Sequence, residues 1–153
     1  MTSITLNVND KDYEVTVAAY HTLSEVLRDK LPFTDVKSSC SSGECGACTV
    51  LVDGKPVVSC LMLAVQADGR KITTVKALSK DGELHLLQKK FIEHEAVQCG
   101  YCTPGMLLSA KALLDSNPKP TEEEVRIAIS GNICRCTGYQ QIIEAIRAAA
   151  AER

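Results

Sequence analysis

Apolar residues occupy every second position in two stretches near the N-terminus, residues 4–8 and residues 13–17. Polar residues fill the positions between them, and residues 9–12 read Asn-Asp-Lys-Asp. Alternation with a period of two is typical of half-buried β-strands, and Asn and Asp favour the turn that joins such strands. The pattern therefore predicts a β-hairpin.

The following segment predicts one short helix and three more strands. Thr22-Leu-Ser-Glu25 has the form of a capping box, and an amphipathic pattern continues from it to Pro32. The strands are expected at residues 49–53, at residues 57–60 and at residues 72–75. This order of elements suits a mixed sheet curled over one helix.

The pattern becomes helical after residues 77–83, which have the composition of a linker. Helices are expected over residues 84–94, 103–115 and 121–129, with a last one after Gly138. Four short helices of this kind make a small bundle. We therefore expect an α+β chain with a sheet domain at residues 1–76, a linker at 77–83 and a helical domain at 84–153.

Charge and composition narrow the function classes. The chain has 17 Lys and Arg against 19 Asp and Glu, so its net charge is −2 and nothing suggests nucleic acid or an anionic membrane as a ligand. The first ten residues contain neither a basic region nor a long apolar run, so we expect no signal peptide, no membrane span and a cytoplasmic location. In that setting eight cysteines are expected to bind metal rather than to form disulfides.

Four of the cysteines lie at Cys40, Cys45, Cys48 and Cys60. The C-x4-C-x2-C run followed by a distant fourth cysteine is the plant-type spacing for a [2Fe–2S] cluster. It also favours the β-grasp arrangement of plant-type ferredoxins for the sheet domain. Glycines within the run suit a backbone wrapped closely around such a cluster. A structural zinc knuckle is the alternative, although zinc sites usually have two C-x2-C pairs.

The other four cysteines form two pairs in the helical half, Cys99 with Cys102 and Cys134 with Cys136. Each pair precedes a predicted helix, so two helix N-termini and four thiolates could face one anionic cluster. A C-x2-C pair together with a C-x-C pair could also bind one tetrahedral zinc ion. The chain's histidines are scattered and are expected to be ordinary solvated residues; they are His21, His85 and His94.

Three motifs together resemble one protein family. They are Cys45-Gly-Ala-Cys-Thr-Val-Leu-Val-Asp-Gly54, Val97-Gln-Cys-Gly-Tyr-Cys-Thr-Pro-Gly105 and Gly131-Asn-Ile-Cys-Arg-Cys-Thr-Gly-Tyr139. Their order and content are similar to the small iron–sulfur subunit of xanthine-dehydrogenase-type molybdenum hydroxylases. The resemblance covers nearly the whole chain. It departs from the family pattern at Ser39, where glycine is common; a serine there would cost about 1 kcal/mol if the position requires a positive φ.

The resemblance implies two [2Fe–2S] clusters and a set of ligands for each. The flavin-side cluster would take Cys40, Cys45, Cys48 and Cys60. The molybdenum-side cluster would take Cys99, Cys102, Cys134 and Cys136. Gln98 and Cys136 match family positions that touch the pterin of the molybdenum cofactor, although Gln98 could equally be an amide that caps its loop.

The function implied is electron transfer within an oxidoreductase. Electrons would pass from a molybdenum cofactor in a large subunit, through both clusters, to FAD in a medium subunit, in a dimer of heterotrimers. The chain has no G-x-G-x-x-G motif, P-loop or catalytic triad, so we expect no substrate-converting site of its own. A free-standing two-cluster ferredoxin and a zinc-bound interaction module are the alternatives, and the substrate class stays open.

Overall fold

The computed structural model places all of residues 1–153. Five strands form one mixed sheet in the order β2-β1-β5-β3-β4. The hairpin of β1 (Thr2–Val8) and β2 (Lys11–Val17) lies at one edge, and its turn residues Asn9 and Asp10 have positive φ values of 53° and 65°. Because Asn and Asp tolerate this conformation better than most residues, the predicted hairpin forms at the expected place.

The other strands complete the sheet away from that hairpin. They are β3 (Thr49–Val52), β4 (Lys55–Val58) and β5 (Lys71–Thr73). β5 runs parallel to β1 and antiparallel to β3, and β3 pairs antiparallel with β4. The predicted order of elements is therefore confirmed, with an additional 3-10 turn at Ala64–Ala67.

The predicted capping box begins the helix beneath the sheet. Thr22 Oγ1 accepts a hydrogen bond from the Glu25 amide (3.3 Å), and Glu25 Oε2 accepts one from the Thr22 amide (2.8 Å). The helix has one α-helical turn, α1 (Leu23–Glu25), which widens into a π-helical turn at Val26–Lys30. Leu23, Val26 and Leu27 are fully buried against the sheet.

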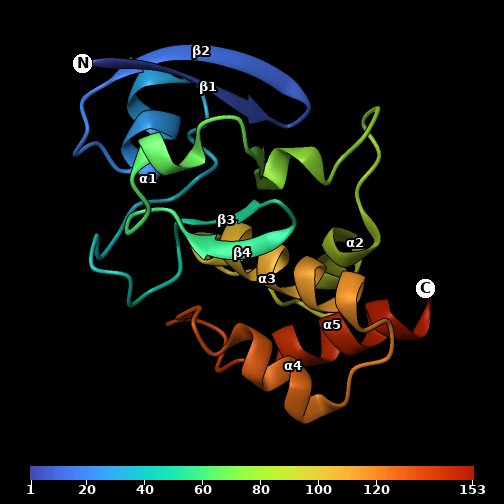
Figure 1. The fold of residues 1–153 in the computed structure, drawn as a ribbon. Helices are drawn as coiled ribbons and strands as arrows, with labels where there is room; N and C mark the ends of the chain where they lie inside the picture. The colour runs from blue at the N-terminus through green and yellow to red at the C-terminus, as the bar shows by residue number, and fades with distance from the viewer.

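The second half of the chain contains the four predicted helices (Figure 1). They are α2 (Leu86–Glu93), α3 (Thr103–Ser116), α4 (Glu122–Ile129) and α5 (Gln140–Ala151). The first begins two residues later than expected because His85 caps it: His85 Nδ1 accepts from the Leu87 amide (3.1 Å). No helix in the structure is both long enough and apolar enough to cross a membrane.

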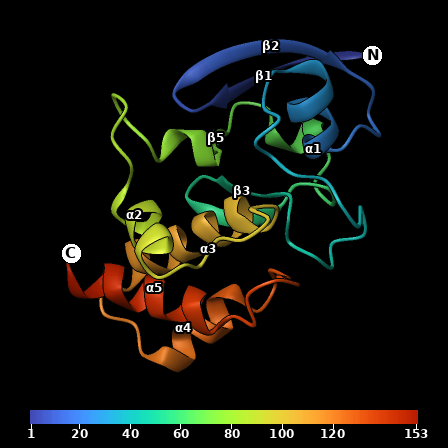
Figure 2. The same cartoon turned by 180° about the vertical axis from the view of Figure 1, so that it is seen from behind.

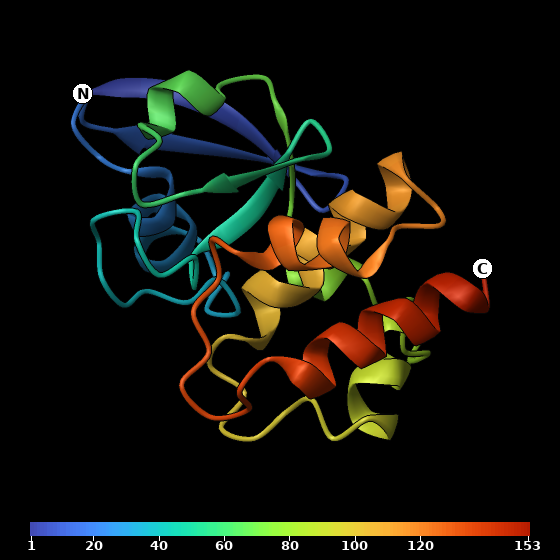
Figure 3. The same ribbon diagram turned by 90° about the horizontal axis from the view of Figure 1, so that it is seen from below.

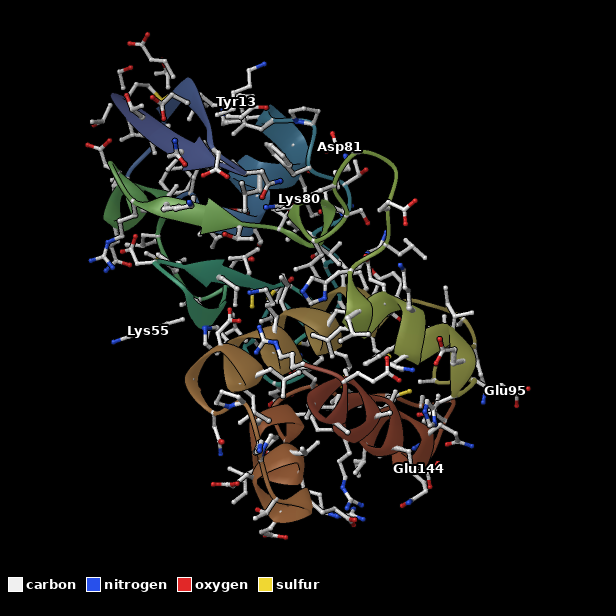
Figure 4. The ribbon with its side chains drawn as sticks, turned by 90° about the vertical axis from the view of Figure 1, so that its right-hand side faces the viewer. Tyr13, Lys55, Lys80, Asp81, Glu95 and Glu144 are labelled. Atoms are coloured by element: carbon white, nitrogen blue, oxygen red, sulfur yellow. The ribbon has the colours of Figure 1, made fainter.

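Two hydrophobic clusters meet where α3 packs against β3 and β4 (Figure 2). One cluster lies between the sheet and α1, and the other lies among the helices. Leu51 on β3 and Leu78 after β5 belong to the helical cluster, so the two halves share packed apolar surface. The segment that links the two halves turns at Asp81 and Gly82, which both have a positive φ. Figure 4 shows Lys80 and Asp81 at this turn.

Two predicted strand ends are wrong. β4 ends at Val58, so Cys60 lies in a turn after the strand rather than within it. β5 ends at Thr73 because Asn9 occupies the hydrogen-bonding groups of the next residue: the Thr74 amide donates to Asn9 Oδ1 (2.8 Å), and Asn9 Nδ2 donates to Thr74 Oγ1 (2.9 Å). A 3-10 turn at Val75–Ala77 follows.

Candidate metal centres

The first cysteine set gathers at one end of the sheet. Cys40, Cys45 and Cys48 lie in the loop before β3, and Cys60 follows β4, its antiparallel neighbour. The Cys60 amide donates to Cys48 Sγ at 3.4 Å, which brings the distant fourth cysteine to the loop. The antiparallel pairing of β3 and β4 thus joins residues that are far apart in the C-x4-C-x2-C…C pattern.

Backbone amides of the loop point at one thiol. The amides of Ser42 and Cys45 donate to Cys40 Sγ at 3.5 and 3.4 Å. These hydrogen bonds, that of Ser42 first, lower the pKa of Cys40 to about 6. Burial and the neighbouring Cys48 raise the pKa of Cys60 to about 11. A bound metal favours the thiolate at every such position, and amide donors stabilise the resulting negative charge.

Two glycines of the loop adopt a backbone conformation that favours glycine. Gly43 and Gly46 have φ values of 82° and 69°, which confirms the expected use of residues without a Cβ. A Cβ built on Gly43 would lie 2.3 Å from Leu61 Cδ1. Ser39 is not among the residues with positive φ, so the serine at the position where the family commonly has glycine carries no such strain. Ser41 does have a positive φ, of 53°.

The second set of thiols is arranged in two cross-pairs. Cys99 and Cys136 are exposed, and their Sγ atoms lie 3.6 Å apart. Cys102 and Cys134 lie deeper, and burial together with the nearby Cys134 raises the pKa of Cys102. Each pair joins one thiol from the loop before α3 with one from the loop before α5, so the two predicted loop-to-helix junctions do face each other.

Two hydroxyl groups just before α5 contact Cys134, the more buried thiol of the deeper pair. The Cys134 amide donates to Tyr139 Oη (2.9 Å), and Cys134 Sγ lies 3.2 Å from Thr137 Oγ1. Although burial opposes it, hydrogen bonding from Thr137 lowers the pKa of Cys134. Burial, followed by the proximity of Cys134, raises the pKa of Cys102 to about 12. The C-x-C-T-G-Y sequence contained these supporting residues, but spacing alone gave no role to Thr137 or Tyr139.

The donor sets fit two-iron clusters. Each set supplies four thiols, and four thiolates, two to each iron, are what a [2Fe–2S] cluster takes. In the second set the Sγ atoms of Cys99 and Cys136 approach to 3.6 Å. Both sets therefore have the ligand type and number that such a cluster needs.

One cavity lies at the second set and reaches one cysteine of the first. It has a volume of about 220 Å³, and its walls include Cys45 from the first set and all four cysteines of the second. Tyr101 and Ile133, which are both exposed, also line it. Figure 3 shows the loop between α4 and α5 beside the segment that leads into β3. The two candidate centres are therefore neighbours within one chain.

Comparisons with known proteins agree with this arrangement. The family described as "2Fe-2S iron-sulfur cluster binding domain" matches residues 6–79, and the family described as "[2Fe-2S] binding domain" matches residues 74–147. The nicotinate dehydrogenase small FeS subunit of Eubacterium barkeri is 52% identical over 145 residues, which are 95% of this chain and 92% of that protein. The chain belongs to the small iron–sulfur subunits of molybdenum hydroxylases.

Further relatives in this family are similar over nearly their full length. The nicotine 6-hydroxylase small subunit of Paenarthrobacter nicotinovorans is 54% identical, over 94% of this chain and 86% of that protein. Among solved structures, a chain of quinoline 2-oxidoreductase from Pseudomonas putida 86 superimposes with a TM-score of 0.95 at 47% identity, covering 99% of this chain and 94% of that one. The resemblance predicted from the three motifs is confirmed, and with it two [2Fe–2S] clusters and an electron-transfer role in an oxidoreductase.

The same fold also occurs within a longer relative. The aldehyde oxidoreductase from Desulfovibrio desulfuricans ATCC 27774 matches with a TM-score of 0.95 at 44% identity; the match covers 99% of this chain but 17% of that one. The unit formed by this iron–sulfur subunit is therefore found both as a separate chain and as part of a larger polypeptide.

Proposed function

We propose that this subunit connects a molybdenum cofactor held by a large subunit to FAD held by a medium subunit. The observation that carries the proposal is that both four-thiol sets lie close together in a single chain, where Cys45 of the first set lines the same cavity as all four cysteines of the second. When bound, the two clusters supply one-electron carriers in series. The protein's own residues hold the clusters, supply hydrogen bonds to the thiolates and exclude water between the two sets.

The ligand sets follow the thiol groups described above. We assign Cys40, Cys45, Cys48 and Cys60 to the cluster on the FAD side. We assign Cys99, Cys102, Cys134 and Cys136 to the cluster on the molybdenum side. Support for the second assignment comes from exposure, because Cys99, Cys136 and the adjoining Gln98 are open to a partner surface. We propose that Gln98 and Cys136 contact the pterin there.

The domain organisation and assembly form part of the same proposal. A β-grasp domain at residues 1–76, a linker at 77–83 and a four-helix domain at 84–153 are supported by the two hydrophobic clusters. The large and medium subunits would complete a heterotrimer, two of which would form the enzyme. Eight free thiols suit a reducing compartment, so we place the complex in the cytoplasm.

The test is purification of the tagged subunit from its native host under gentle conditions. Co-purification of two larger subunits, together with two distinct EPR signals after reduction, is the expected result. A chain that purifies alone with both clusters intact and reduces a separate enzyme would instead indicate a free-standing ferredoxin.

A further inference from the structure

A buried asparagine joins the two cysteine loops. Asn132 lies two residues before Cys134 and is only 4% exposed. Its Oδ1 accepts a hydrogen bond from Ser109 Oγ on α3 at 2.7 Å. Its Nδ2 donates to the carbonyl of Gly46 at 3.0 Å and to Thr49 Oγ1 at 3.3 Å. One amide group therefore connects the loop of each cysteine set with the helix between them.

The Gly46 carbonyl is the point on which these contacts converge. The amide and the hydroxyl of Thr49 also donate to it, at 3.2 and 2.7 Å. Nothing larger than a hydrogen fits around this point: a Cβ on Gly46 would lie 2.2 Å from the Gly131 carbonyl oxygen, and one on Gly105 would lie 2.4 Å from the Gly46 carbonyl oxygen. The backbones of three segments thus touch directly.

The contact places one candidate ligand of each cluster at the ends of a short bonded route. The amide of Ile133 donates to the carbonyl of Cys45 at 2.9 Å. Cys45 belongs to the first thiol set, and Cys134 of the second set is bonded directly to Ile133. The route between these two cysteines therefore consists of covalent bonds and a single hydrogen bond. Electron tunnelling weakens steeply as a bonded route is broken or lengthened.

The remaining contacts between the halves do not depend on Asn132. Tyr101 Oη donates to the Ser38 carbonyl, and α3 packs on β3 and β4. Each half also has its own hydrophobic cluster. Loss of the asparagine amide should therefore leave both halves folded while it loosens the contact between the cysteine loops.

We propose that Asn132 is a positioning residue that sets the electronic coupling between the two clusters. It does so by holding the Gly46 carbonyl, so that the adjacent Cys45 carbonyl stays within hydrogen-bonding distance of the Ile133 amide. Ser109 fixes the orientation of the asparagine amide, and Thr49 completes the contact. The inference rests on the proposed function, because it takes the two thiol sets as the ligands of two clusters in series.

The test compares Asn132→Ala and Ser109→Ala with a matched control in the intact complex. Ser24→Ala is the control, since Ser24 is as buried as Ser109 (5% exposed) but its hydroxyl contacts only Thr22 within the sheet half. Two readouts are taken on each protein after reduction with dithionite. One is the magnetic splitting between the two cluster signals in low-temperature EPR, and the other is hydrogen exchange at the Ile133 amide.

The expected result for Asn132→Ala is a reduced splitting and several-fold faster exchange at Ile133, with unchanged iron content and with both individual signals present. Ser109→Ala should show the same changes to a smaller degree, and Ser24→Ala should show neither. Unchanged splitting in an iron-replete Asn132→Ala protein would overturn the proposal. If Asn132→Ala loses iron, unchanged splitting in an iron-replete Ser109→Ala protein would overturn the proposal in its place. Absence of two cluster signals from the unsubstituted complex would instead refute the proposed function.

Discussion

The amide of Ile133 and the carbonyl of Cys45 are joined by a hydrogen bond of 2.9 Å across 88 positions of sequence, counted as 133 − 45. The two residues lie in different halves of the chain, each beside or within one thiol set. This contact makes the two sets parts of one structure rather than two independent metal sites. The predictions below concern the support of each set and the contact between them.

Cys134→Ser should damage the cluster of the helical half and spare the other. Cys134 is buried in the helical half, so a serine there removes one of four thiolates from the second set only. We expect iron to fall from about four atoms to about two per chain, with loss of one EPR signal. The measurement is EPR with iron analysis, and two unchanged signals would contradict the assignment.

Tyr139→Phe should weaken the same cluster without removing a ligand. The substitution removes the oxygen that accepts from the Cys134 amide, and Cys134 is only 8% exposed. An unsatisfied buried donor costs about 1–3 kcal/mol. We expect faster loss of iron from the helical half to a chelator. Tyr20→Phe is the control because Tyr20 is highly exposed; equal rates in both variants would show that the hydrogen bond does not matter.

Gly46→Ala should prevent the two cysteine loops from coming together. Its φ is 69°, and the new methyl group would lie 2.2 Å from the Gly131 carbonyl oxygen. Gly54→Ala is the matched control, since Gly54 also has a positive φ, of 80°, but faces open space. The control should lose only about 1 kcal/mol of stability. Recovery of iron-loaded complex is the measurement, and equal recovery of the two variants would contradict the packing described here.

The titration of His85 should lower the stability of the folded protein in mild acid. Burial, followed by the charges of Lys111 and Arg153, lowers the pKa of this helix-capping imidazole in the folded state. The pKa of His85 in the folded state lies below its unfolded value of about 6.5. The contribution of His85 to the free energy of unfolding is therefore complete above about pH 6.5 and is lost as the pH falls through the folded pKa.

The measurement is Tm at about pH 7.5 and about pH 5.5, at one scan rate. His85→Asn keeps a capping side chain without a titrating ring. On acidification, the Tm of this variant should fall by less than the Tm of the unsubstituted protein. His94→Gln, at the other end of α2, is the control and should retain the original pH dependence. An unchanged pH dependence in His85→Asn would show that the imidazole is not responsible.

Local patterns were sufficient to predict most elements of the fold. The capping boxes at Thr22 and Thr121 and the alternating hairpin residues act over a few positions, so their elements appeared where expected. The end of β5 was predicted wrongly because it depends on a contact between distant residues. Asn9 ends β5 across 65 positions of sequence, and no local pattern indicates that pairing.

In the candidate site, too, local patterns were predictable and contacts between distant residues were not. Cysteine spacing predicted the two thiol sets because metal ligands within a loop have characteristic separations. The role of Asn132 was not predictable from its motif, since its partners Gly46 and Ser109 lie 86 and 23 positions away. The partners of a buried amide depend on how the halves pack, and that packing is a property of the folded chain.

Metal analysis of the complex purified gently from its native host tests the central claim most directly. The account predicts about four irons per copy of this chain, in two [2Fe–2S] clusters, together with stoichiometric molybdenum. Two irons with one zinc per chain would mean that one thiol set has been misassigned. Four irons in a stable chain without molybdenum or larger subunits would contradict its place between a molybdenum cofactor and FAD.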